Sequence, residues 1–205
     1  GDPLPEGKKN VVILGCSHTW GVGLEPHETW AHHVSQHRTD KLRYWNLAQP
    51  GAGADTIVRM LYSCEKVLFP KIIIVMWPQI SRRERLEDYP RNLQGTHKTL
   101  KFENSVTDTN NFNKNVFFLE KFAEKNNAKT LHCFSDMFYD FRTPGNSPQV
   151  LEHVTLRNCW PHWYKFTSRD LHTKPSHARD GIHFGVEHHE RFAKLFLDKF
   201  GSKLR

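Results

Sequence analysis

Val11-Val12-Ile13-Leu14-Gly15-Cys16-Ser17-His18-Thr19 is the stretch of sequence that decides the fold. Its apolar residues run without polar alternation, which predicts a strand at Asn10–Leu14 that is buried on both faces of a parallel sheet. A glycine then breaks the run, and a serine follows two residues later. In open α/β sheets, ligands and reactive groups lie just beyond the carboxyl ends of the strands. Ser17 therefore stands where a nucleophile is useful, although a helix N-cap is the simpler use of a serine at such a turn.

The rest of the chain alternates between strand and helix patterns. Further strands are predicted at Arg43–Leu47, Lys71–Met76 and Ala128–Phe134, and helices at Thr29–His37 (capped by Thr29), Gly53–Val67, Phe112–Asn126 and Val186–Phe200, with Gly201 at the last C-cap. This alternation predicts an α/β fold, a three-layer α/β/α sandwich around a mostly parallel sheet. Right-handed crossovers place all strand carboxyl ends at one edge of that sheet. We expect Ser17, the Gly51 loop, residues 77–85 and residues 135–136 to meet there.

The length of 205 residues suits a single domain over 1–205. Two stretches, at about 78–111 and 137–178, lack a clear period and are too long for simple connections. We interpret them as loop excursions from that domain. A fifth short strand or a helical insert is expected in the second.

Composition excludes several function classes. No apolar run approaches the ~20 residues of a membrane span, and the four cysteines are scattered without a C-x-x-C pair, which favours a reducing, cytoplasmic location over secretion. The net charge is +7 and the pI is near 9.3. Lysines and arginines are dispersed rather than clustered, so nucleic-acid binding is the weaker interpretation. The charge favours anionic substrates or partners without requiring them.

Asp180-Gly181-Ile182-His183, near the other end of the chain, supplies a carboxylate and an imidazole three residues apart. Two side chains at that spacing on a turn can face the same way. A serine needs a base to remove its proton, and the base needs an acid to fix its tautomer. A helix-capping aspartate beside an exposed histidine is the alternative, in a chain with 14 histidines.

Three segments together resemble the sequence blocks of the SGNH (GDSL-like) hydrolases. They are residues 15–19 (with Cys16 where the family has aspartate), residues 46–51, which end in Gly51, and residues 180–183. The resemblance implies the family's flavodoxin-like α/β architecture and an acyl-enzyme at Ser17. It further implies that His183 is the base, that Asp180 orients it, and that the N–H groups of Ser17 and Gly51 hold the oxyanion. No cofactor and no metal are implied.

The third block departs from the family. Gly-x-Asn-Asp is usual after the third strand, whereas this chain has Trp77-Pro78-Gln79-Ile80, so Gln79 is the nearest substitute for the oxyanion asparagine. Trp77, Arg82 and Arg83 follow the same strand and are expected to rim the cleft, where they could bind substrate. The alternative is that they cover the core edge and a solvated surface. Similar alternatives apply to Trp160, His162 and Trp163, whose loop cannot be placed.

Two other patterns carry competing chemistry. His33 and His37 lie one helical turn apart, and His188-His189 adds two imidazoles, but no H-E-x-x-H or cysteine pair accompanies them. We interpret all four as surface histidines. Cys16 is discounted as a nucleophile because its side chain is expected to point opposite to that of Ser17, toward the core.

The sequence therefore predicts a serine esterase that hydrolyses an acyl or O-acetyl ester of a small molecule or a carbohydrate, with a Ser17–His183–Asp180 triad. The main alternative is a catalytically impaired binding module on the same fold, for carbohydrate or another polyanion. A nucleic-acid or polyanion binder that uses the basic surface is a third possibility. The substrate and the oligomeric state are not determined by these patterns.

Overall fold

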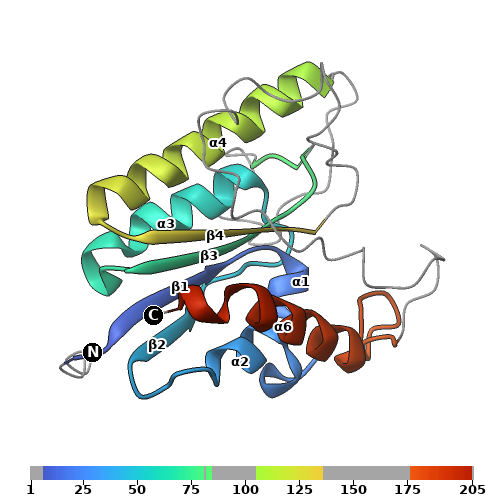
Figure 1. Cartoon of the computed structure of the whole chain (residues 1–205). Helices are drawn as coiled ribbons and strands as arrows, with labels where there is room; N and C mark the ends of the chain where they lie inside the picture. Colours follow the sequence, from blue (N-terminus) through green and yellow to red (C-terminus); the bar gives the residue numbers. More distant parts are fainter. Residues whose placement is uncertain (1–6, 81, 85–104, 136–175, 205) are drawn as a thin grey trace.

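The computed structural model describes residues 7–80, 82–84, 105–135 and 176–204. The strands are β1 (Lys9–Leu14), β2 (Leu42–Asn46), β3 (Ile72–Trp77) and β4 (Lys129–Phe134), and the α-helices are α1 (Ser17–Trp20), α2 (Trp30–Ser35), α3 (Ala54–Leu68), α4 (Ser105–Asn126) and α6 (Val186–Phe200), with 3₁₀ turns η1 (Pro26–Glu28) and η5 (Gly201–Lys203). The strands form a parallel sheet in the order β2-β1-β3-β4. Helices α3 and α4 cover one face, and α2 and α6 cover the other (Figure 1). The three-layer α/β fold is confirmed, whereas a single domain over 1–205 stays a prediction.

Burial on both faces explains why β1 and β3 have continuous apolar runs. Val12 and Leu14 lie in the core beneath α3 and α4, while Val11 and Ile13 lie in the core beneath α2 and α6. The residues of β3 divide in the same alternating way, and all six are buried. Since each residue of these strands is removed from water, polar alternation is absent from the sequence.

Most element boundaries fall within two residues of the prediction; one predicted cap is confirmed, and two features differ. Thr29 caps α2 as expected, since its hydroxyl accepts from the N–H of His32 at 3.1 Å. Helix α4 begins at Ser105, so it takes in part of the excursion predicted at 78–111. Gly201 occupies the C-cap of α6 but keeps right-handed dihedrals (φ −54°), and the chain continues into η5.

Much of the excursion predicted at 137–178, with its expected strand or insert and with Trp160, His162 and Trp163, lies outside the described residues. Within the described part of the chain, no helix combines the length and the apolar character that crossing a membrane requires.

Trp77 corrects one prediction, because it lies in the core and does not rim the cleft. Strand β3 extends to this residue, and Trp77 shares the face of Ile73 and Val75, so its ring is fully buried. Its indole Nε1–H donates to His132 Nδ1 at 2.9 Å, and the two rings stack with centroids 6.1 Å apart. A substrate contact by Trp77 is therefore excluded in this conformation.

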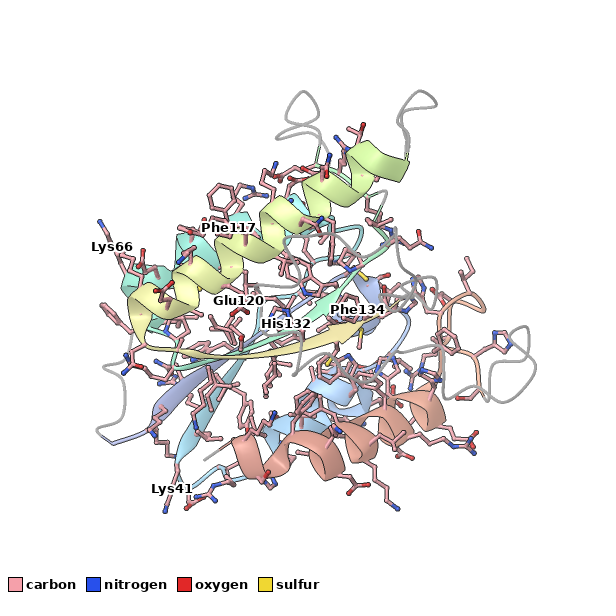
Figure 2. All side chains as sticks on the ribbon, turned by 45° about the horizontal axis from the view of Figure 1, so that its top comes forward. Lys41, Lys66, Phe117, Glu120, His132 and Phe134 are labelled. Carbon is pink, nitrogen blue, oxygen red and sulfur yellow. The ribbon has the colours of Figure 1, made fainter. Side chains whose placement is uncertain are left out.

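The second nitrogen of His132 completes a buried polar network. His132 Nε2 lies 2.6 Å from Glu120 Oε1, and Figure 2 shows Glu120 reaching from α4 toward the strand that carries His132. Because Trp77 donates to Nδ1, Nε2 carries the ring proton and donates to the carboxylate. Burial raises the pKa of Glu120, but the hydrogen bond from His132 outweighs it and leaves the pKa below its ordinary value. The network ties α4 to β4.

Replacing Trp77 by Phe is expected to destabilise the fold by about 1–3 kcal/mol, since it leaves the acceptor nitrogen of His132 buried without its donor. Urea unfolding followed by circular dichroism measures the loss. Trp20→Phe is the matched control, because Trp20 is 53% exposed and is expected to lose far less. Equal, small losses in the two variants would contradict the buried placement of Trp77.

Candidate active site

Ser17 is the first residue of α1, directly beyond the carboxyl end of β1. The N-cap position belongs to Cys16, whose carbonyl accepts from the N–H groups of Thr19 and Trp20. Ser17 is therefore not the cap, and its side chain is not committed to a capping hydrogen bond. The residue is only 8% exposed, and Cys16 is fully buried in the core on the α3–α4 side, as predicted from the strand parity.

Gly15 makes this turn possible because no side chain fits there. A Cβ at Gly15 would lie 2.1 Å from Thr19 Oγ1 and 3.2 Å from the carbonyl oxygen of Met76. The chain can therefore fold back at once from β1 into α1. This tight reversal presents the start of α1, and with it the N–H of Ser17, at the edge of the sheet.

The loop after β2 lies beside this turn. The N–H of Gln49 donates to the carbonyl of Gly15 at 3.1 Å, and Gly51 adopts a left-handed conformation at φ +77°. Among the described residues, no group accepts a hydrogen bond from the N–H of Ser17 or of Gly51. Both donors predicted for the oxyanion are thus free to bind a ligand.

Asp180 and His183 are in direct contact. Asp180 Oδ1 accepts from the N–H groups of Ile182 and His183, each at 3.0 Å, and Oδ2 lies 2.5 Å from His183 Nδ1. Burial opposes ionisation of Asp180, but these hydrogen bonds prevail and hold its pKa well below the ordinary value. An ionised Asp180 accepts a hydrogen bond from Nδ1–H, which leaves Nε2 of His183 as the basic nitrogen.

Several contacts hold the Asp180 loop against the residues that follow α1. The N–H of Arg179 donates to the carbonyl of Gly23 at 3.0 Å, and a Cβ at Gly23 would lie 3.1 Å from the carboxyl carbon of Asp180. Arg179 also binds Glu28 through two hydrogen bonds, of 2.6 and 2.9 Å. The structure therefore brings Asp180 and His183 to the end of the sheet that carries Ser17.

Three histidines lie near His183: His18, which is half-buried, and His188 and His189, which are buried. The ring of His18 meets the ring of His183 edge-on at 5.8 Å, and His188 stacks on Phe184 at 4.2 Å. His189 Nδ1 accepts from the N–H of Trp30 at 3.0 Å. Burial is the main cause of the lowered pKa of both His18 and His189, the latter to about 3, so both are neutral at pH 7.

These positions correct the prediction that His188 and His189 are surface residues. Both are at most 2% exposed, because they lie on the inner face of α6 between Phe184 and Phe192 along the chain. Their apolar partners replace the water that a surface imidazole would contact. His33 and His37 are half-buried. Among the described side chains, no group of three or more His, Cys, Asp or Glu residues is placed to share a metal ion.

The remaining candidates, Gln79, Arg82 and Arg83, lie in the segment after β3 and have different surroundings. Gln79 is exposed, and its carbonyl accepts from the N–H of Arg82 at 3.0 Å. Arg83, predicted to bind substrate, instead pairs with Asp108 of α4 at 3.0 Å. Arg82 lies close enough to His18 for its charge to lower the pKa of that imidazole, after the larger effects of burial and of His183. Of the two arginines, Arg82 is therefore the one at the site.

No protein-family model matches the sequence, and neither does any curated protein. Solved structures do match. The structure of TesA superposes with a TM-score of 0.66 at 13% identity, over 95% of this chain and 99% of the other. The structure of the psychrotrophic esterase EstA from Pseudoalteromonas sp., inhibited by monoethylphosphonate, superposes with a TM-score of 0.64 at 14% identity. The match covers 96% of this chain and 99% of EstA. The structure of an acetyl xylan esterase, Est2A, from the rumen bacterium Butyrivibrio proteoclasticus superposes with a TM-score of 0.61 at 14% identity. The match covers 99% of this chain and 66% of Est2A.

The chain has the SGNH-hydrolase fold. In open α/β sheets, reactive groups lie beyond the carboxyl ends of the strands, and the structure brings Ser17, Gly51, Asp180 and His183 to that edge. At such low identity the likeness establishes the architecture alone. What the chain does has to be argued from its own site.

Two features were not predicted from the sequence. The first is the contact of His18 with His183, although His18 directly follows Ser17 and that adjacency could have marked it as a neighbour of the base. The second is a cavity of about 300 Å³ beside α1, which Trp20, Leu24 and Asn46 line among others and which Ser17, Gly51, Asp180 and His183 do not line. An exposed tryptophan one turn after the candidate nucleophile is the signal that could have found this cavity.

The Glu28–Arg179 contact predicts a specific loss of stability in acid. The hydrogen bond from Arg179 is the main reason that the pKa of Glu28 falls from 4.5 to about 2. A carboxyl whose pKa is lower in the folded state stabilises the fold above pH 4.5, and that contribution fades as the pH falls toward 2. Glu28→Gln should therefore be less stable than the parent at pH 6–7, with a difference that shrinks below pH 4.5.

Urea unfolding between pH 3 and 7 measures this difference. The exposed Glu190 provides the matched control as Glu190→Gln. A Glu28→Gln deficit that stays constant across the whole range would contradict the ionic contact.

Proposed function

We propose that this protein is a serine esterase that hydrolyses acyl or O-acetyl esters through an acyl-enzyme at Ser17. The observation that carries the proposal is the Asp180–His183 contact of 2.5 Å, on a loop bound to the turn that follows the serine helix. A histidine held in one tautomer by an ionised carboxylate, at the same edge of the sheet as a serine that does not cap its helix, supports this proposal, because such a histidine can activate a hydroxyl.

In this mechanism, His183 Nε2 takes the proton of Ser17 as the hydroxyl oxygen attacks the ester carbonyl carbon. The resulting imidazolium is stabilised by Asp180, which stays ionised. The proton then passes to the departing alkoxide, so that the alcohol leaves and the acyl group remains on Ser17. A water molecule attacks the acyl-enzyme, again with His183 as the base, and the carboxylic acid is released.

The N–H groups of Ser17 and Gly51 are the proposed oxyanion donors. Each aligned donor can be worth ~3 kcal/mol in the transition state. Gln79 is the position at which the sequence offers a third donor amide, on a longer side chain than the asparagine it would replace. Because the Gln79 side chain is exposed, it contributes only if substrate draws it inward.

The substrate class rests on the similar structures. EstA is an esterase inhibited by a phosphonate, and Est2A is an acetyl xylan esterase. These support a small-molecule or carbohydrate ester as the substrate. The missing third-block asparagine favours one competing proposal, a binding module on the same fold that has lost its activity.

A fluorophosphonate probe distinguishes the two proposals. The esterase proposal expects one label on Ser17, located by mass spectrometry, and no label in Ser17→Ala or His183→Ala. Cys16→Ser and Ser63→Ala are suitable controls, because Ser63 lies exposed on α3, far along the chain from the turn. An unlabelled but folded parent protein would favour the binding module.

Asp180→Asn tests the tautomer argument. The amide can offer its NH₂ rather than an anionic acceptor to Nδ1, so the base nitrogen of His183 is no longer enforced. We expect kcat for 4-nitrophenyl acetate to fall by about 10³- to 10⁴-fold, as for other triads. Asp198→Asn, on the exposed side of α6, should leave kcat unchanged. A loss of less than tenfold in Asp180→Asn would contradict the assigned role.

A further inference from the structure

Arg82 is a cation without a counter-ion at the edge of the site. In the part of the chain that the structure describes, no hydrogen bond or ion pair involves its guanidinium, and its Nε and Nη1 atoms are shielded from solvent. Shielded N–H donors without an acceptor are costly, because they have lost their hydrogen bonds to water without a replacement. Such a group indicates a ligand that supplies the missing negative charge.

Among the described residues of this segment, the two charges next to Arg82 are both engaged. Arg83 pairs with Asp108 on α4, and Glu84 accepts from Arg59 Nε on α3 at 2.9 Å. These contacts fasten residues 83–84 to the two helices above the sheet. Arg83 and Glu84 therefore attach the segment to the helices, and among its described residues Arg82 is the charged side chain without an ionic partner.

Backbone contacts also fix the position of Arg82. Its N–H donates to the carbonyl of Gln79, and its own carbonyl lies against Gly53, where a Cβ would stand 2.6 Å from the oxygen. Gly53 is the N-cap of α3, so this carbonyl oxygen lies at the positive end of the helix. The guanidinium is thus presented from a fixed point of the backbone rather than from a free loop.

Arg82 also lies on the correct side of the sheet. Its charge acts on His18, which follows Ser17 in the chain and whose ring contacts that of His183. Besides burial and Arg82, the described groups that lower the pKa of His18 are His183, His189 and His188, and none of these three is an anion.

We propose that the ester substrate carries a carboxylate, and that Arg82 binds this carboxylate and so selects anionic esters over neutral ones. The inference rests on the proposed esterase function and narrows its substrate class. An arginine binds a carboxylate through charge-assisted hydrogen bonds, which are stronger than those between neutral groups. The dispersed positive charge of the whole chain, +7, favours the approach of such a substrate.

The test compares two esters of equal chain length, 4-nitrophenyl hexanoate and the mono-4-nitrophenyl ester of adipic acid. Arg82→Gln should raise KM for the anionic ester by about 10- to 100-fold, the range for losing a charged hydrogen bond. Activity on the neutral ester should change less than threefold. Arg82→Lys, which keeps the charge, should recover part of the loss.

Lys66→Gln is the matched control for net charge. Lys66 lies at the end of the molecule opposite the strand carboxyl ends (Figure 2), so its loss should affect neither ester. If Arg82→Gln lowers kcat equally for both esters at unchanged KM, Arg82 acts on the reacting oxygen, and the proposal is overturned. Unchanged kinetics for both esters would overturn it as well.

A binding measurement separates this proposal from the esterase mechanism. Calorimetric titration of Ser17→Ala with adipate needs no turnover, and it should show binding that Ser17→Ala/Arg82→Gln loses. That result supports the anion site even if Ser17 proves not to be a nucleophile. If adipate does not bind Ser17→Ala, or if it binds Ser17→Ala and Ser17→Ala/Arg82→Gln equally, the proposed anion site is contradicted, whatever the probe labelling shows.

Discussion

β1 pairs in parallel with β2 on one side and with β3 on the other, and the site depends on this pairing. Parallel strands end at the same edge, so the turns after these three strands lie side by side. Ser17 follows the first, Gly51 the second and Arg82 the third. The strands hold this register because both of their faces are buried, and a shift of one residue would exchange the side chains of the two cores.

Residues 180–183 also lie at this edge, although they do not follow a strand of the described sheet. The loop that carries Asp180 and His183 precedes α6, and it is fastened to the turn after α1 through Gly23 and Glu28. Buried histidines on the inner face of α6 fill the space behind it. The Asp180–His183 contact itself lies at the surface, with about a quarter of each side chain exposed.

The segment after β3 shows how a departure from a family pattern can be compensated elsewhere. The asparagine expected there is replaced by Gln79, and the tryptophan that begins the block, Trp77, packs in the core and binds His132. The charged residues Arg83 and Glu84 fasten the segment to α4 and α3, whereas Arg82 has no ionic partner among the described residues. A change in one strand end thus coincides with a new cation a few residues later.

The apolar runs determined the strands, and the amphipathic patterns determined the helices, because burial on one face or on two leaves different periods in a sequence. The blocks around Ser17 and His183 determined the candidate residues. Tertiary structure decided the rest. Trp77 is buried because β3 runs one residue further with the parity of Ile73, and His188 is buried because α6 turns that face inward. Asp108 binds Arg83 and not the adjacent Arg82, and it lies 25 residues from Arg83 in the sequence. A local sequence pattern cannot predict a contact between residues that far apart.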